Sequence, residues 1–224
     1  MLWLALVLVP MLFALWAQYR TQSTFKKYSQ VGSRSGLTGA QAARRLLDLD
    51  RLNDVPIERI GGTLTDHYDP RARALRLSEP VHDSASLAAV GVAAHEMGHA
   101  LQHAEGYQPL MFRQAFYPTA ALASKAWIWL LIAAMVLRFS PAAGPLFVAA
   151  MICLGAYALF ALVTLPVEFD ASRRDMLLLE SSHTLTDDEL VGSRAVLNAA
   201  AMTYVASAAQ ALGLLASYAL GSRR

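Results

Sequence analysis

Residues 86–107 read SLAAVGVAAHEMGHALQHAEGY and carry the pattern HEMGH at positions 95–99. Their composition is typical of a helix, and a glycine stands just past its expected end. In a helix, two histidines four residues apart lie on one face, about one turn apart. Neutral imidazole is a preferred zinc ligand, so His95 and His99 can hold one ion. Glu96 can then act as general base on the water that the metal activates.

The pattern is short, so it leaves a second interpretation open. A helix with two hydrogen-bonded histidines and a surface glutamate would show the same five residues. A metal site requires a third ligand elsewhere in the chain. The chain has one cysteine, Cys153, which lies inside an apolar block. This excludes a disulfide within the chain and a cysteine-based metal site, so any metal must be held by histidines and carboxylates.

The composition is that of a membrane protein. The chain has 224 residues, of which 55% are hydrophobic and 16% are charged, and its mean hydropathy is +0.35. The apolar residues gather in long blocks, as expected for helices that cross a bilayer. A net charge of +2 is too small to suggest a nucleic-acid partner. We therefore expect the lipid bilayer as a partner and no nucleic acid.

Four segments are long and apolar enough to span a bilayer. Residues 1–17 are predicted to form an N-terminal transmembrane anchor, since they lack the basic start and the cleavage site of a secretory signal. Residues 117–137 and 146–165 are the next spans, and Pro166 is predicted to end the latter. Residues 195–220 are a fourth span, rich in small residues that suit helix packing. A soluble amphipathic helix is the alternative for this last segment.

Residues 18–116 are predicted to form a small α+β domain at the membrane surface. Its first helix begins at Thr38, where Gln41 completes a capping box three residues later. Two extended stretches around an Asp-Pro turn at 69–70 predict a β-hairpin. The helix with the HEMGH pattern follows and covers residues 84–104.

The third ligand is expected in residues 166–190. If the spans alternate across the bilayer, this segment returns to the side that holds the HEMGH helix. Glu168 is the leading candidate, because it lies two residues into a helix that begins at a proline. That helix would carry Ser172 and Asp175 on the face of Glu168, whereas Asp170, the rival ligand, would point elsewhere. A charge that only stabilises a helix N-terminus is the other interpretation of Glu168.

The basic residues predict the orientation in the membrane. They concentrate after the first span and again at Arg173 and Arg174, on the side of the predicted site. The other side carries Arg138, Arg223 and Arg224. The positive-inside rule therefore places the site on the cytoplasmic side. We expect a multi-pass integral protein of a bacterial cell membrane.

Other histidines and tyrosines could contribute to the site. His103 lies eight residues after His95 and can either support the metal site or pack as a surface residue. A transition-state donor could come from any of five further residues, which the sequence does not rank: His67, His82, His183, Tyr68 and Tyr107.

Three segments together resemble the membrane-bound neutral zinc metallopeptidases of the YugP-like family: HEMGHALQHAEGY, GGTLTDHYDPRARALRLS and LPVEFDASRRD. The resemblance covers nearly the whole chain. It implies a mostly α-helical integral membrane protein with a zincin-like α+β domain at the membrane surface. On this sequence it also implies a Zn2+ ion held by His95, His99 and Glu168, with Glu96 as the base.

The chain departs from the wider gluzincin pattern at one position. Gluzincins place an aspartate four residues after the glutamate ligand, where it supports a ligand histidine. Ser172 stands at that position here. The supporting role could therefore fall to Ser172, Asp170 or Asp175.

The predicted function is zinc-dependent hydrolysis of peptide bonds in a peptide or protein substrate, which could be membrane-associated. As a further hypothesis, the strand at 73–78 pairs with an extended substrate, so proline at Leu75 or Leu77 would cut activity.

An intramembrane protease is a weaker alternative, because the apolar lead-in to His95 is too short to span. A non-catalytic membrane protein with a structural zinc or a partner-binding role would require a closed, four-ligand site, usually with cysteine.

Overall fold

The computed structural model describes residues 2–221, which form mainly helices and one three-stranded sheet. Met1 of the predicted anchor, and Arg223 and Arg224 of the predicted topology, lie outside the described residues. The described chain divides into two compact units. The first comprises residues 2–16, 108–166 and 203–221, and the second comprises residues 17–107 and 167–202.

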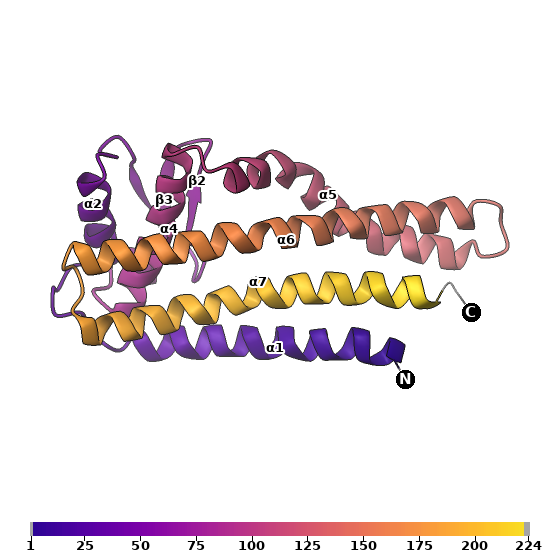
Figure 1. The fold of residues 1–224 in the computed structure, drawn as a ribbon, viewed down its shortest axis with the longest axis horizontal. Coiled ribbons are helices and arrows are strands. Elements are labelled where there is room, and N and C mark those ends of the chain that lie inside the picture. Colours follow the sequence, from indigo (N-terminus) through magenta and orange to yellow (C-terminus); the bar gives the residue numbers. More distant parts are fainter. Residues whose placement is uncertain (1, 222–224) are drawn as a thin grey trace. The chain divides into compact units, whose positions relative to one another are not determined.

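The first unit is built from parts of four long helices (Figure 1). These are α1 (Leu2–Tyr28), α5 (Gln108–Val136), α6 (Ala143–Ser181) and α7 (Asp187–Gly221). Each helix contains a stretch that is long and apolar enough to cross a membrane. This agrees with the four predicted spans, although every helix extends beyond the predicted segment at one or both ends.

The prediction that Pro166 ends a helix is wrong. Helix α6 continues through Pro166 to Ser181. Proline removes one backbone N–H, but such a gap is tolerated within long apolar helices where neighbouring groups satisfy the backbone. Glu168 therefore stands in the interior of a continuous helix, where its direction is fixed by the turns on both sides.

The second unit contains the sheet, whose strands are β1 (Ile57–Ile60), β2 (His67–Asp69) and β3 (Ala74–Ser78). Strands β2 and β3 pair in antiparallel fashion, which confirms the predicted hairpin. Strand β1 pairs parallel to β3 and was not predicted, because its four residues include a central charged pair and give little apolar signal.

The strand order β1-β3-β2 corrects the hypothesis about substrate pairing. Strand β3 lies in the centre, so both of its edges already hydrogen-bond to neighbours. It has no free edge for a substrate, and Leu75 and Leu77 are core residues with no exposed surface. Proline at either position would therefore damage the core. Strand β2 is an edge strand of the sheet, and its Tyr68 N–H donates to Glu96 of the helix that carries the HEMGH pattern.

Helix α4 (Leu87–Ala104) is the central helix of the second unit. It begins three residues later than predicted, because the Ser86 side chain accepts the N–H of Ala89 and caps the first turn. Its buried face packs on α2 (Gly39–Leu49), on the sheet and on α3 (Glu79–His82). The predicted capping box of α2 is present. The core residues come from several elements: Leu46, Leu47, Leu75, Leu77, Val90, Met97 and Leu179.

Two glycines let α4 approach its neighbours closely. A methyl group on Gly91 would lie 2.4 Å from Ser193 Oγ of α7, and one on Gly98 would lie 2.0 Å from Asp175 Oδ1 of α6. The two glycines are seven residues apart and so share one helix face. Their lack of a side chain brings α4 against the parts of α6 and α7 that belong to the second unit.

Candidate metal centre

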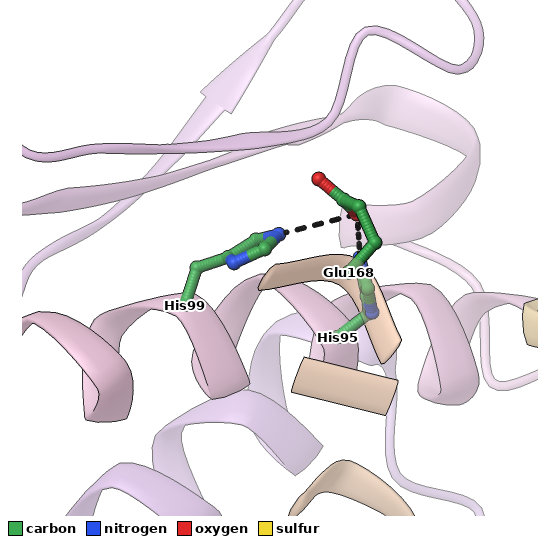
Figure 2. Close-up of side chains that lie close together, drawn as sticks. All are labelled: His95, His99 and Glu168. Atoms are coloured by element: carbon green, nitrogen blue, oxygen red, sulfur yellow. Dashed lines mark hydrogen bonds and ion pairs between the residues drawn. The ribbon is translucent and has the colours of Figure 1, made fainter. Parts of the chain in front are cut away.

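The side chains of His95, His99 and Glu168 lie together between α4 and α6 (Figure 2). Nε2 of His95 is 3.1 Å from Glu168 Oε2, and Nε2 of His99 is 3.6 Å from the same oxygen. One donor atom from each residue lies within 4.8 Å of the others. Among residues 2–221, this is the group of histidine, cysteine and carboxylate side chains found able to hold a metal ion.

Local helix geometry accounts for the meeting of the three side chains. The two histidines stand one turn apart on α4, with ring centroids 4.8 Å apart. Glu168 faces them from α6, and its side chain is only 2% exposed. All three residues belong to the second unit, which packs as one compact body. The structure thus brings together all three of the predicted ligands.

The Nδ1 atom of His95 faces hydrogen-bond acceptors on α6. Asp175 Oδ2 lies 3.0 Å from it, and Ser172 Oγ lies 3.4 Å away. A carboxylate can only accept, so the ring donates from Nδ1 to Asp175, and Nε2 is the nitrogen that faces Glu168, where a metal ion would take the place of a proton. The sequence left three candidates for this supporting contact, and the geometry favours Asp175, seven residues and two turns after Glu168.

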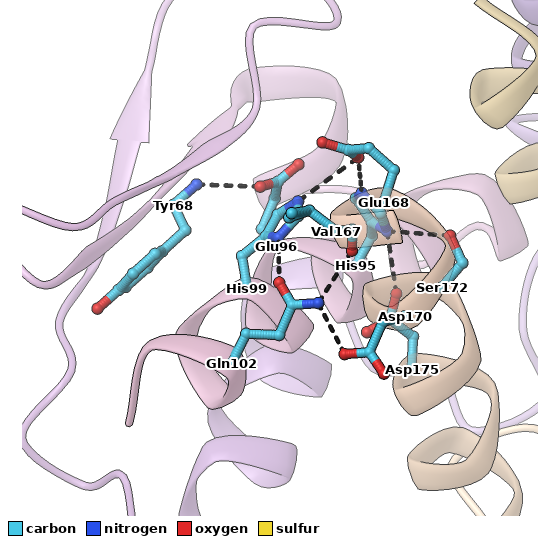
Figure 3. Close-up of polar contacts among 10 residues, drawn as sticks. All are labelled: Tyr68, His95, Glu96, His99, Gln102, Val167, Glu168, Asp170, Ser172 and Asp175. Carbon is cyan, nitrogen blue, oxygen red and sulfur yellow. Dashed lines mark hydrogen bonds and ion pairs between the residues drawn. The ribbon is translucent and has the colours of Figure 1, made fainter. Parts of the chain in front are cut away.

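His99 is oriented by Gln102, a residue that the sequence analysis did not single out (Figure 3). Gln102 Oε1 lies 3.0 Å from His99 Nδ1, and its amide nitrogen donates to Val167 O and to Asp170 Oδ2 at 2.9 and 2.8 Å. The two acceptors fix the amide so that its oxygen faces the ring. His99 must then donate from Nδ1, so Nε2 is again the nitrogen that faces Glu168.

Asp170 belongs to this supporting network and not to the three-residue group. Its carboxylate also accepts a hydrogen bond from Arg174 Nε at 2.6 Å, and Arg174 in turn pairs with Glu105 of the α4 C-cap. The prediction that Asp170 points away from the face of Glu168 matches its contacts. Its placement gives no support to its role as the rival ligand.

Glu96 is buried and is held by the edge strand of the sheet. Its Oε2 accepts the backbone N–H of Tyr68 at 3.0 Å. The Tyr68 hydroxyl lies 2.8 Å from His103 Nδ1, two turns further along α4. Burial and the nearby Arg73 guanidinium lower the pKa of His103, which favours the neutral ring that accepts from a hydroxyl. Tyr68 therefore joins β2 to α4 at two points, and its ring points away from the three-residue group (Figure 3).

The other candidates lie elsewhere. His67 and His82 make local contacts with Thr65 O and Asp83. His183 is exposed in the turn after α6, and the Tyr107 ring packs near Arg174. The structure places none of these four side chains with the three-residue group.

Comparisons with known proteins identify the family of this chain. Residues 3–223 match a family described as "Putative neutral zinc metallopeptidase". The chain belongs to this family. It is also 44% identical over 208 residues to the "Putative membrane protease YugP" of Bacillus subtilis (strain 168), a match that covers 93% of this chain and 91% of the relative. No solved structure gives a significant match. The predicted resemblance to the zinc metallopeptidase family is therefore confirmed.

The donor set fits the zinc ion that the family description implies. Burial disfavours charge on the His95 ring, but hydrogen bonds to Asp175 and Glu168 outweigh it and raise the pKa of His95 well above its usual value. The surroundings of His95 thus favour a positive charge, and buried carboxylates require one. Two imidazoles and one carboxylate are also a donor set that zinc accepts with a fourth position open to water.

Gly98 is predicted to be essential for the contact between Asp175 and His95. A methyl group at this position would collide with Asp175 Oδ1 and lie 3.2 Å from Ala171 O. Gly98→Ala should therefore displace the Asp175 carboxylate and weaken zinc binding by about tenfold or more, the usual cost of losing such a support. Competition with a chromogenic chelator measures this affinity.

Gly155→Ala is the matched control, because nothing lies within 4 Å of the added methyl group on α6. It should leave the zinc affinity unchanged. If Gly98→Ala binds zinc as tightly as the control, Asp175 does not hold His95 for metal binding.

Proposed function

We propose that this chain is a membrane-bound zinc metallopeptidase that hydrolyses peptide bonds. In this proposal His95, His99 and Glu168 hold one zinc ion, and Glu96 is the general base. The observation that carries the proposal is the approach of both Nε2 atoms to one Glu168 oxygen, while each Nδ1 is tied to an acceptor. The family description supports the choice of zinc and of peptide hydrolysis.

Each residue of the centre has a separate role in the proposed hydrolysis. A zinc ion held by the three residues supplies a Lewis acid that lowers the pKa of a water and polarises the scissile carbonyl. Glu96 takes the proton of the attacking water and passes it to the leaving nitrogen. The Tyr68 N–H holds Oε2 of Glu96, so Oε1 is the oxygen free to exchange the proton. Asp175 and Gln102 keep the two rings in the tautomer that binds metal through Nε2.

The arrangement argues against a purely structural zinc. A structural site is closed by four protein ligands, whereas the group here offers three. Glu96 also stands directly after the first ligand and keeps one carboxylate oxygen beyond its contact with Tyr68, as a general base requires. We favour hydrolysis on these grounds over a non-catalytic role.

We also propose that the site faces the cytoplasm of a bacterial cell. The relative from Bacillus subtilis is named a membrane protease, and four helices here could cross a membrane. Several basic residues lie in the same unit as the site: Arg20, Lys26, Lys27, Arg173 and Arg174. The positive-inside rule supports a cytoplasmic position for a unit with this charge.

Zinc removal tests the proposed function directly. The purified full-length chain should contain about one zinc per molecule and cleave unfolded or membrane-anchored peptides, since one catalytic site needs one ion. A chelator should abolish cleavage, and added Zn2+ should restore it. A zinc-loaded protein that cleaves neither soluble nor membrane-anchored peptides of a broad library would overturn the proposal.

A further inference from the structure

Helix α6 sets how far Glu168 lies from the edge of the bilayer. Residues 143–167 contain no charged side chain, and Glu168 is the first one in the helix. At 1.5 Å per residue, this uncharged stretch of about 25 residues is about 37 Å long. The hydrocarbon core of a bilayer is about 30 Å thick. The stretch therefore exceeds the core by only about 7 Å, which is the largest distance by which Glu168 would clear it for an untilted helix.

Side-chain exposure on α6 points to the same boundary. Phe169 follows Glu168 and is 47% exposed, so the outward face of the helix is still apolar at the level of this ligand. The next strongly exposed charge is Arg173, whose side chain is 73% exposed. Exposed aromatic residues and then arginines are typical of the passage from hydrocarbon to head groups. Arg173 lies five residues beyond Glu168, or about 7.5 Å along the helix axis.

We propose that the substrates are membrane-anchored polypeptides, cut close to the point where their spanning segment leaves the bilayer. This inference rests on the proposed function, since it takes the centre at His95, His99 and Glu168 as catalytic. An extended chain advances about 3.3 Å per residue, so a centre within about 7 Å of the core reaches the first few residues after a span. A bond held far from the membrane by a rigid structure would lie out of reach.

The position of the proposed base adds a constraint on the substrate. Glu96 is buried and already accepts the Tyr68 N–H at the edge of the sheet. A scissile bond must therefore be brought to it by an extended stretch of chain whose backbone groups are not already bonded. The segment that follows a spanning helix meets this requirement when it is unstructured. A continuous helix that runs from the span into the cytoplasm does not.

A set of single-span substrates that differ in the distance between the span and the cleavable segment tests the inference. Each substrate carries the same randomised cassette of about ten residues, placed directly after the span or after a rigid helical spacer of about 20 residues, which is about 30 Å long. The full-length, zinc-loaded protein and each substrate are placed together in phospholipid nanodiscs, which expose both faces of the bilayer. We expect the cassette next to the span to be cut at least about tenfold faster than the distant one, as the two distances differ by far more than the reach of the centre.

A flexible Gly/Ser spacer of the same length is the control. It lets the distant cassette fold back to the membrane, so it should restore most of the cutting. Equal cutting with the rigid spacer, or of the cassette as a free soluble peptide, overturns the inference while the proposed function stands. Failure of the zinc-loaded protein to cut any substrate overturns both.

Discussion

Replacing Glu96 by glutamine should leave zinc binding intact and lower peptide hydrolysis by about two to four orders of magnitude, the usual contribution of general acid–base catalysis. Glutamine has nearly the same shape and can still accept the N–H of Tyr68 through its oxygen, so the contact between β2 and α4 should survive. It cannot take a proton from water at neutral pH. Zinc content and initial rates on one peptide, measured on the same preparation, separate the two effects.

Glu79→Gln is the control for this change. Glu79 is an exposed residue of α3 that pairs with Arg59, so the variant removes a carboxylate of the same kind without touching the centre. It should keep both zinc and activity. A Glu96→Gln protein that hydrolyses peptides at the rate of this control would remove Glu96 from the mechanism.

Replacing Glu168 should have the second large effect, and on a different quantity. Glu168→Gln exchanges a buried anionic ligand for a neutral amide, a much poorer partner for Zn2+. We expect the protein to lose stoichiometric zinc and measurable hydrolysis together. Because metal binding stabilises the folded state by mass action, added zinc should no longer raise the melting temperature.

Glu180→Gln provides the comparison on the same helix. Glu180 is exposed near the end of α6, three turns beyond Glu168. This variant should bind zinc and respond to it as the wild type does. If Glu168→Gln retains one zinc per chain with the wild-type affinity, Glu168 is not the third ligand.

The three candidate ligands could be predicted from two kinds of information. One is the spacing of residues within a single helix, and the other is the order of the membrane spans along the chain. The spacing of His95 and His99 depends only on the helix period. Glu168 was found because the apolar spans return its segment to the side of the two histidines. The capping box at Thr38 and the β2–β3 hairpin likewise follow from residues close in sequence.

The continuity of α6 could not be predicted from the residues around Pro166. In a soluble protein, proline usually ends or kinks a helix, and this expectation produced the wrong boundary. The long apolar stretch before it and the packing of its last turns against α4 override the local preference. The continuous helix matters for the centre, because it places Asp175 two turns after Glu168, within hydrogen-bond distance of His95 Nδ1.

The supporting residues could not be ranked from sequence because their partners are distant in the chain. Gln102 meets Val167 O and Asp170 only after α4 and α6 have packed together. The close approach at Gly98 that admits Asp175 is equally a property of two helices. Even so, Gln102 stands three residues after His99 on the same helix, a spacing that can mark a partner for a ligand histidine.

X-ray absorption at the zinc edge of the purified full-length protein tests the central claim most directly. We expect about one zinc per chain, bound by two imidazole nitrogens and by light oxygen atoms at about 2.0–2.2 Å, with the spectrum unchanged in Glu96→Gln. A bound sulfur atom, a third or fourth imidazole, or the absence of stoichiometric zinc would contradict a centre built from His95, His99 and Glu168.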